Sequence, residues 1–119
     1  MSASSVQEIK TVLHPVSDVE KAKAVYSALL GVAPQADSSY YVGFDVAGQH
    51  IGLLPGGGPQ GLTSPVAYWH VDDIEAKLAD VTTVGATVKD PANEVGGGRV
   101  VASVIDPDGN TLGLIQDNA

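Results

Sequence analysis

One short pattern, D-x-x-G-x-x-x-G-L, occurs twice in the sequence at a constant offset. Residues 45–54 read DVAGQHIGLL and residues 106–115 read DPDGNTLGLI. A second pair, VSDVE at 16–20 and VDDIE at 71–75, recurs in the same order. Two ordered matches predict an internal duplication. Because 119 residues suffice for about one domain, the copies are expected to be half-domain modules.

The first copy contains the signals of one helix among β-strands. Its turn, capping and alternation patterns predict a strand at 6–15, a helix opened by a capping box at Ser17 and ended by Gly31, and strands at 38–46 and 49–54 around a turn at Ala47-Gly48.

The second copy repeats this order after the Gly- and Pro-rich segment 55–65. The same signals predict a strand at 66–71, a helix capped by Asp72 and ended near Gly85, and strands around 86–89, 99–105 and 110–116. The repeated unit is therefore β-α-β-β-β. We expect one α+β domain over residues 1–119, with module 1 at about 7–54, a linker at 55–65 and module 2 at about 66–117.

The composition limits the partners of such a domain. The net charge is −8 and the six Lys and Arg residues are scattered, which disfavours nucleic acid and anionic membranes as partners. The absence of cysteine removes disulfides, thiolate metal sites and thiol nucleophiles. The N-terminal segment MSASSVQEIK lacks the apolar run of a signal peptide, and no stretch is long enough for a membrane span. We therefore expect a cytoplasmic protein.

Three segments of the chain resemble a known family. HPVSDVEKAKAVYSALLGV, YWHVDDIEAKLADVTTVGATV and VIDPDGNTLGLIQ are similar to the vicinal oxygen chelate superfamily, which includes glyoxalase I, extradiol dioxygenases and bleomycin-resistance proteins. The resemblance implies two βαβββ modules that form a curved sheet around a pocket, with helices on the outside, and it implies a homodimer. Because the superfamily includes both metalloenzymes and metal-free binding proteins, the resemblance specifies the fold better than the function.

The resemblance also implies where a metal would bind. In metal-dependent members, four pocket-facing residues on the first, fourth, fifth and eighth strands hold a divalent ion. The matching positions are Thr11, Gly52, Val66 and Gly113. Glycine and valine offer no side-chain donor, and Thr11 offers only a neutral hydroxyl. We therefore expect no metal at these positions.

Strand alternation predicts which residues face the pocket. If the shared Leu53 and Leu114 lie on the helix-covered faces, Gly52 and Gly113 face the pocket. In the same pattern, the Asp side chains are expected to accept hydrogen bonds from turn backbone, and the following Gly to take a positive φ.

The remaining pocket candidates are polar and aromatic. By alternation, His70 shares a strand face with Tyr68 and His50 shares one with Gly52, whereas His14 is expected on the helix side. A ring on the wall suits a flat, partly apolar ligand. The predicted ligand-binding residues are Thr11, His50, Gly52, Tyr68, His70 and Gly113.

Two other aromatic positions have different expectations. Trp69 has the opposite alternation from Tyr68, which favours a core or interface residue. Tyr40 and Tyr41 both satisfy the alternation in one register or the other, so that the pocket-facing member of this pair stays open.

We favour a metal-independent, small-molecule-binding protein with no catalytic residue and no cofactor, whose ligand is small and partly aromatic or hydrophobic. The alternative is an enzyme. It would be a lyase, isomerase or dioxygenase of the superfamily with a displaced metal at His50 and His70, or a cofactor-free acid–base catalyst using one of these histidines. A ligand should stabilise a binding protein with or without a chelator, whereas a chelator should destabilise a metalloenzyme.

Overall fold

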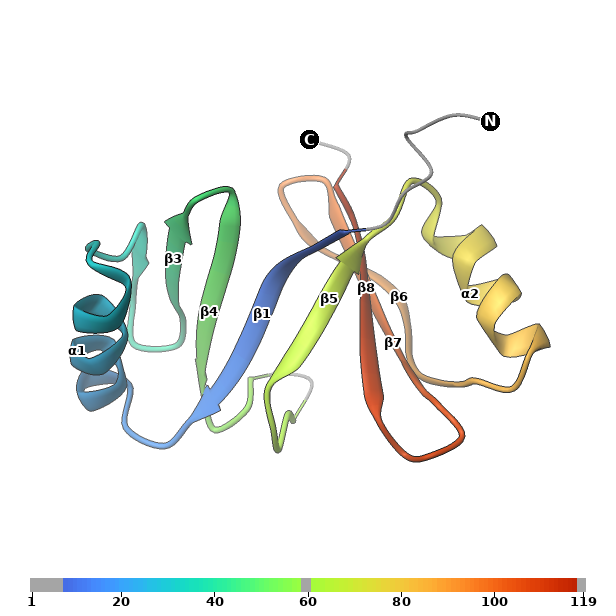
Figure 1. The fold of residues 1–119 in the computed structure, drawn as a ribbon, viewed down its shortest axis with the longest axis horizontal. Coiled ribbons are helices and arrows are strands. Elements are labelled where there is room, and N and C mark those ends of the chain that lie inside the picture. The colour runs from blue at the N-terminus through green and yellow to red at the C-terminus, as the bar shows by residue number, and fades with distance from the viewer. Residues whose placement is uncertain (1–7, 59–60, 118–119) are drawn as a thin grey trace. The chain divides into compact units, whose positions relative to one another are not determined.

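The computed structural model describes residues 8–58 and 61–117, which form two compact units (Figure 1). We call residues 10–66 the N-terminal unit, and residues 67–117 together with residues 8–9 the C-terminal unit. The elements of the first half are β1 (Glu8–Val16), α1 (Val19–Leu30), β2 (Ala36–Asp37), β3 (Val42–Val46) and β4 (Gln49–Pro55). Those of the second half are β5 (Val66–His70), α2 (Ile74–Thr83), β6 (Thr87–Gly96), β7 (Arg99–Ile105) and β8 (Thr111–Asp117).

The same strand topology occurs in each half. The N-terminal sheet has the order β2-β3-β4-β1, in which β3 is antiparallel to both neighbours and β1 is parallel to β4. The C-terminal sheet has the order β5-β8-β7-β6, with β5 parallel to β8 and the other pairs antiparallel. The prediction of an α+β fold built from two βαβββ modules is confirmed.

Both helices begin one residue later than expected. The N-caps are Asp18 and Asp73, and each Oδ1 accepts a hydrogen bond of 3.1 Å from the backbone N–H three residues on. The expected caps, Ser17 and Asp72, lie one position earlier. For α2 the reason is packing, since this helix starts at Ile74, whose side chain is buried, and the residue directly before it becomes the cap. Neither α1 nor α2 has the length and apolar content that a bilayer span requires.

Two strands differ from their expected bounds by more than two residues. Residues 38–41 form a turn instead of the start of a strand, because Ser38 Oγ bonds to both the backbone N–H and the carbonyl of Tyr41. Conversely, β6 continues through Pro91 to Gly96. Proline is tolerated there because β6 is at the edge of its sheet, where a missing N–H leaves no neighbour unpaired, and the β6–β7 register has irregularities.

Each unit has its own core between its helix and its sheet. Val42, Phe44 and Leu53 are fully buried beneath α1. In the other unit, Leu78 of α2 packs with residues of β7 and β8, including Leu114. The expectation that Leu53 and Leu114 lie on helix-covered faces is confirmed, and the opposite faces of the two sheets are left for other roles.

The expected linker, residues 55–65, is fastened to the N-terminal unit. The Leu62 N–H donates to the Gly57 carbonyl over 3.0 Å, and the Leu62 side chain is buried. Gly57 is required here, because its φ is +87° and a Cβ on it would lie 2.3 Å from the Leu62 carbonyl oxygen. Residues 6–7 of the expected first strand and residues 59–60 of the linker lie outside the described residues, and the module boundaries stay a prediction.

Candidate functional site

Three of the predicted ligand-binding residues lie together on the N-terminal sheet. Thr11 of β1 is paired with His50 of the neighbouring parallel strand β4, and Gly52 lies two residues further along β4. Alternation from the buried Leu53 puts His50 and Gly52 on the face opposite α1. The Thr11 side chain is almost fully buried.

His50 is held between two side chains from the neighbouring strand and turn. Its Nδ1 lies 2.5 Å from Asp45 Oδ1, and its Nε2 is hydrogen-bonded to the hydroxyl of Tyr41. A carboxylate only accepts, so in the neutral imidazole Nδ1 carries the proton and Nε2 accepts from the Tyr41 O–H. The result is a Tyr41–His50–Asp45 chain of hydrogen bonds, which we call the Tyr–His–Asp chain.

Two glycines make room for the rings of this chain. Gly43 of β3 and Gly52 of β4 face each other across the hairpin. A Cβ on Gly43 would lie 2.8 Å from His50 Cε1 and 2.9 Å from Tyr41 Cε2. A Cβ on Gly52 would lie 2.7 Å from the Tyr41 hydroxyl oxygen. The rings therefore lie against bare backbone, at a spacing that any larger residue would disturb.

His14 lies on the other face of β1, as expected. Its Nδ1 is 3.2 Å from the Tyr26 hydroxyl oxygen of α1, and the two rings meet edge to face with centroids 5.3 Å apart. Burial between helix and sheet lowers the pKa of His14 from its ordinary value of 6.5.

This lowered pKa predicts a loss of stability in mild acid. The unfolded chain protonates His14 below about pH 6.5, whereas the folded chain resists, so stability is complete above that pH and falls as the pH decreases toward the lowered folded pKa. In urea titrations between pH 7.5 and 5, we expect His14→Gln to lose less stability than the wild type. Tyr26→Phe should keep the wild-type slope because burial remains, and an equal slope in His14→Gln would contradict the assignment.

The other three predicted residues lie on the C-terminal sheet. Tyr68 of β5 is paired with Gly113 of β8, and His70 lies two residues along β5 from Tyr68. A Cβ on Gly113 would lie 2.4 Å from Tyr68 Cδ2, so that the Tyr68 ring covers the glycine. Burial, and then the negative charge of Asp90, raise the pKa of the Tyr68 phenol. Asp90 also accepts a 2.7 Å hydrogen bond from the buried Ser103 hydroxyl.

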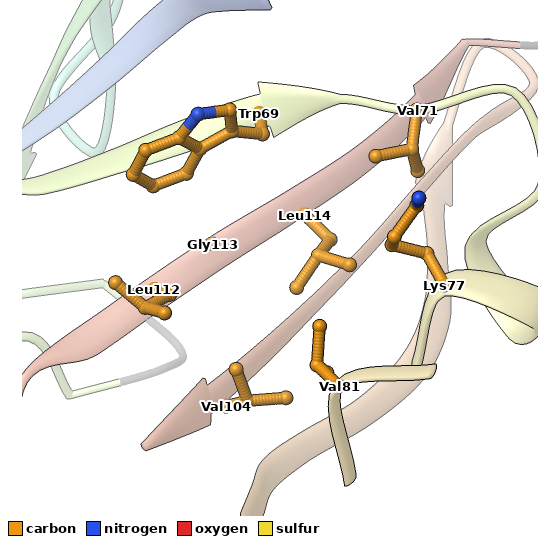
Figure 2. A pocket seen from close by; sticks show the side chains of 8 residues that line it. All are labelled: Trp69, Val71, Lys77, Val81, Val104, Leu112, Gly113 and Leu114. Carbon is orange, nitrogen blue, oxygen red and sulfur yellow. The ribbon is translucent and has the colours of Figure 1, made fainter. Parts of the chain in front are cut away.

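A cavity of about 350 Å³ lies in the C-terminal unit, on the side of the sheet that α2 covers (Figure 2). Its apolar wall includes Trp69, Leu112 and Leu114 from the sheet and Val81 from α2. Figure 2 shows the Lys77 side chain reaching from α2 toward Val71, and its ammonium is the charged group of the lining. No ion pair among the described residues involves Lys77.

The two D-x-x-G patterns have different structures. Asp106 accepts hydrogen bonds from the backbone N–H groups of Asp108 and Asn110 and from the Asn110 side chain, as the sequence predicted, and these bonds lower its pKa. For Asp45 the prediction of a turn-capping role is wrong, because its carboxylate is hydrogen-bonded to the His50 ring. The following glycines, Gly48 and Gly109, both have the expected positive φ.

The sequence pattern of one protein family matches residues 8–114 of the chain: the Glyoxalase/Bleomycin resistance protein/Dioxygenase superfamily. The chain belongs to this superfamily. No curated protein sequence matches the chain.

Solved structures with the same fold share little sequence with this member of the superfamily. A hypothetical protein, BH1468 from Bacillus halodurans, has a TM-score of 0.78 at 13% identity over 95% of this chain and 96% of its own. Methylmalonyl-CoA epimerase from Mycobacterium tuberculosis has a TM-score of 0.70 at 15% identity over 100% of this chain and 93% of its own. A Mn(II)-bound glyoxalase from Novosphingobium aromaticivorans has a TM-score of 0.71 at 21% identity over 94% of this chain, but only 39% of its own. At these identities the likeness establishes the fold alone.

The residues at the superfamily's metal-ligand positions do not fit a metal ion in this member. Val66 and the two glycines offer no side-chain donor. Leu13 and Tyr41 fill the space above Gly52, and the Tyr68 ring fills the space above Gly113. Across residues 8–58 and 61–117, no three His, Cys, Asp or Glu side chains gather closely enough to hold a metal ion.

Sequence reasoning missed three features of the site. It left Tyr41 undecided against Tyr40 and assigned Asp45 to a turn, although a two-residue turn at 47–48 already pairs Asp45 with His50. The strand register that this turn imposes was the signal by which the Asp45–His50 pair could have been predicted. No sequence pattern indicated the cavity beside Trp69, since the cavity depends on how α2 packs on the sheet. The assignment of all six predicted residues to one pocket stays a prediction.

Proposed function

We propose that this superfamily member is a metal-independent protein that binds a small, partly aromatic or hydrophobic molecule in the cavity of the C-terminal unit. The observation that carries the proposal is the cavity, whose volume of about 350 Å³ is in the range of small-molecule sites. The lack of donors at the superfamily's metal positions supports a metal-independent mode.

The lining indicates the class of ligand. Trp69, Leu112 and Val81 provide an apolar wall on which a ring gains affinity by burial. Lys77 is half-buried and has no ion-pair partner among the described residues. An anionic group on the ligand would form an ion pair with its ammonium. An aromatic carboxylate combines both features.

The test uses naphthalene-2-carboxylate and its uncharged match, naphthalene-2-methanol. We expect the carboxylate to quench the fluorescence of Trp69, the single tryptophan of the sequence. It should also raise the melting temperature of the protein equally with and without EDTA. Lys77→Gln should weaken carboxylate binding about tenfold, equivalent to about 1.4 kcal/mol, and leave alcohol binding unchanged.

Lys21→Gln is the matched control, because Lys21 is an exposed lysine on the other helix, α1. Leu112→Trp should remove binding of both probes by filling the cavity. Binding that survives Leu112→Trp would place the ligand elsewhere, and stabilisation that requires added metal would favour the alternative enzyme with a displaced metal site.

The proposal includes a homodimer in the cytoplasm. It is supported by the superfamily resemblance and by apolar side chains that α1 exposes, Val25 at 63% and Leu29 at 75%. Sedimentation equilibrium of the wild type and of Leu29→Glu measures the oligomeric state.

A further inference from the structure

The Tyr–His–Asp chain of the N-terminal unit has the arrangement of an activated nucleophile. Such sites join a weakly acidic hydroxyl, a base and a group that orients the base. Here Tyr41 supplies the hydroxyl, His50 Nε2 the base, and Asp45 holds His50 Nδ1–H at 2.5 Å. This function goes beyond the proposed ligand binding and uses a different unit of the chain.

The backbone fixes the geometry of the Tyr–His–Asp chain. Asp45 and His50 are directly paired across the β3–β4 hairpin, whose two-residue turn has φ of +53° at Ala47 and +78° at Gly48. The Tyr41 and His50 rings are nearly parallel, with 14° between their planes and 6.0 Å between their centroids. Since Gly43 leaves no room for a side chain beneath either ring, the rings are positioned before any ligand arrives.

Two side chains of the Tyr–His–Asp chain, those of His50 and Asp45, are partly exposed to solvent. The side chain of His50 is 25% exposed and that of Asp45 is 59% exposed. A hollow of about 370 Å³, lined by residues 45–49, adjoins Asp45. Tyr41 as a whole residue is half-buried.

We propose that Tyr41 is a nucleophile for activated acyl esters, with His50 as its base and Asp45 as the residue that positions His50. The Tyr41 oxygen attacks the acyl carbon while the phenol proton moves to His50 Nε2, and Asp45 balances the imidazolium charge. The ester oxygen leaves with the proton from His50, and an acyl-tyrosine remains. Water, deprotonated by His50, then releases the carboxylic acid and restores Tyr41.

The neighbouring Tyr40 provides an internal control. Its side chain is 77% exposed, and no hydrogen bond among the described residues joins it to a histidine. A reaction that depends only on exposure labels Tyr40 first, whereas one that depends on His50 labels Tyr41 first.

The experiment treats the full chain with p-nitrophenyl acetate and maps acetyl-tyrosine over time by peptide mass spectrometry. In the wild type we expect acetylation of Tyr41 about 100-fold faster than of Tyr40. His50→Gln should slow Tyr41 labelling about 100-fold, and Asp45→Asn at least about tenfold. Tyr40→Phe should change nothing at Tyr41.

The competing outcomes are distinct. Equal labelling of both tyrosines in the wild type overturns the proposal without any variant, so it is testable even if His50→Gln does not fold. Fast labelling of Tyr41 that persists in folded His50→Gln also overturns it. Naphthalene-2-carboxylate binding is measured on the same samples, and loss of that binding in the cavity leaves the Tyr41 result unaffected.

Discussion

Phe44→Ala is expected to lower the free energy of unfolding by about 3–5 kcal/mol, which corresponds to a fall in melting temperature on the order of 10 °C or more. Phe44 is fully buried on β3, and its ring is the largest side chain at the centre of the N-terminal core. Its removal deletes the apolar contacts and leaves a cavity beneath α1. Because small domains have only about 5–15 kcal/mol of stability, the loss is a large fraction of the total.

Urea denaturation monitored by circular dichroism measures this effect. Tyr40→Ala is the matched control, since Tyr40 is an aromatic residue of the same unit with 77% exposure, and it should change stability by less than about 0.5 kcal/mol. Phe44→Ala should also disturb the Tyr–His–Asp chain, because Asp45 follows Phe44 on β3. A Phe44→Ala loss as small as that of Tyr40→Ala would show that the N-terminal core is packed differently.

Gly113→Ala is the second change with a large expected effect, a loss of about 2–3 kcal/mol. The added Cβ would lie 2.4 Å from Tyr68 Cδ2 and 2.6 Å from Tyr68 Cγ. Tyr68 is only 2% exposed and has no room to withdraw. The cost is steric, since Gly113 does not have a positive φ.

Gly52→Ala is the matched control on the equivalent strand of the other unit. There the nearest atoms are Leu13 Cδ2 and the Tyr41 hydroxyl oxygen, the far ends of side chains that move more easily than the base of a buried ring. We therefore expect a smaller loss. If collision with Tyr68 is the cause, Gly113→Ala should cost little in a Tyr68→Ala background, and an undiminished cost in that double-mutant cycle would contradict it.

Much of the fold was predictable because its signals are local. The repeated D-x-x-G and V-x-D patterns mark corresponding hairpins and helix openings, and their order along the chain is enough to specify two βαβββ modules. Leu53 and Leu114 were assigned correctly because strand alternation needs only neighbouring residues. The cap positions were wrong by one residue, since Ser17 and Asp18, like Asp72 and Asp73, are both good cap residues and residue type alone does not choose between neighbours.

The functional residues were less predictable because they depend on contacts between strands. Asp45 and Asp106 occupy matching positions in the repeat, yet only Asp45 meets a histidine. In the first hairpin a two-residue turn pairs Asp45 with His50. In the second, Ile105 pairs with Thr111, so Asp106 stays within a longer loop and caps its backbone.

The sequence by itself therefore determined the family, the duplicated topology and the lack of side-chain metal donors at Gly52, Val66 and Gly113, because each of these follows from residue types at fixed spacings. Only the tertiary structure decided that tyrosine rings fill the space above Gly52 and Gly113, that Tyr41 rather than Tyr40 meets His50, and that a cavity opens beside Trp69. The physical reason is that hairpin register and helix packing are set by the summed burial of many side chains.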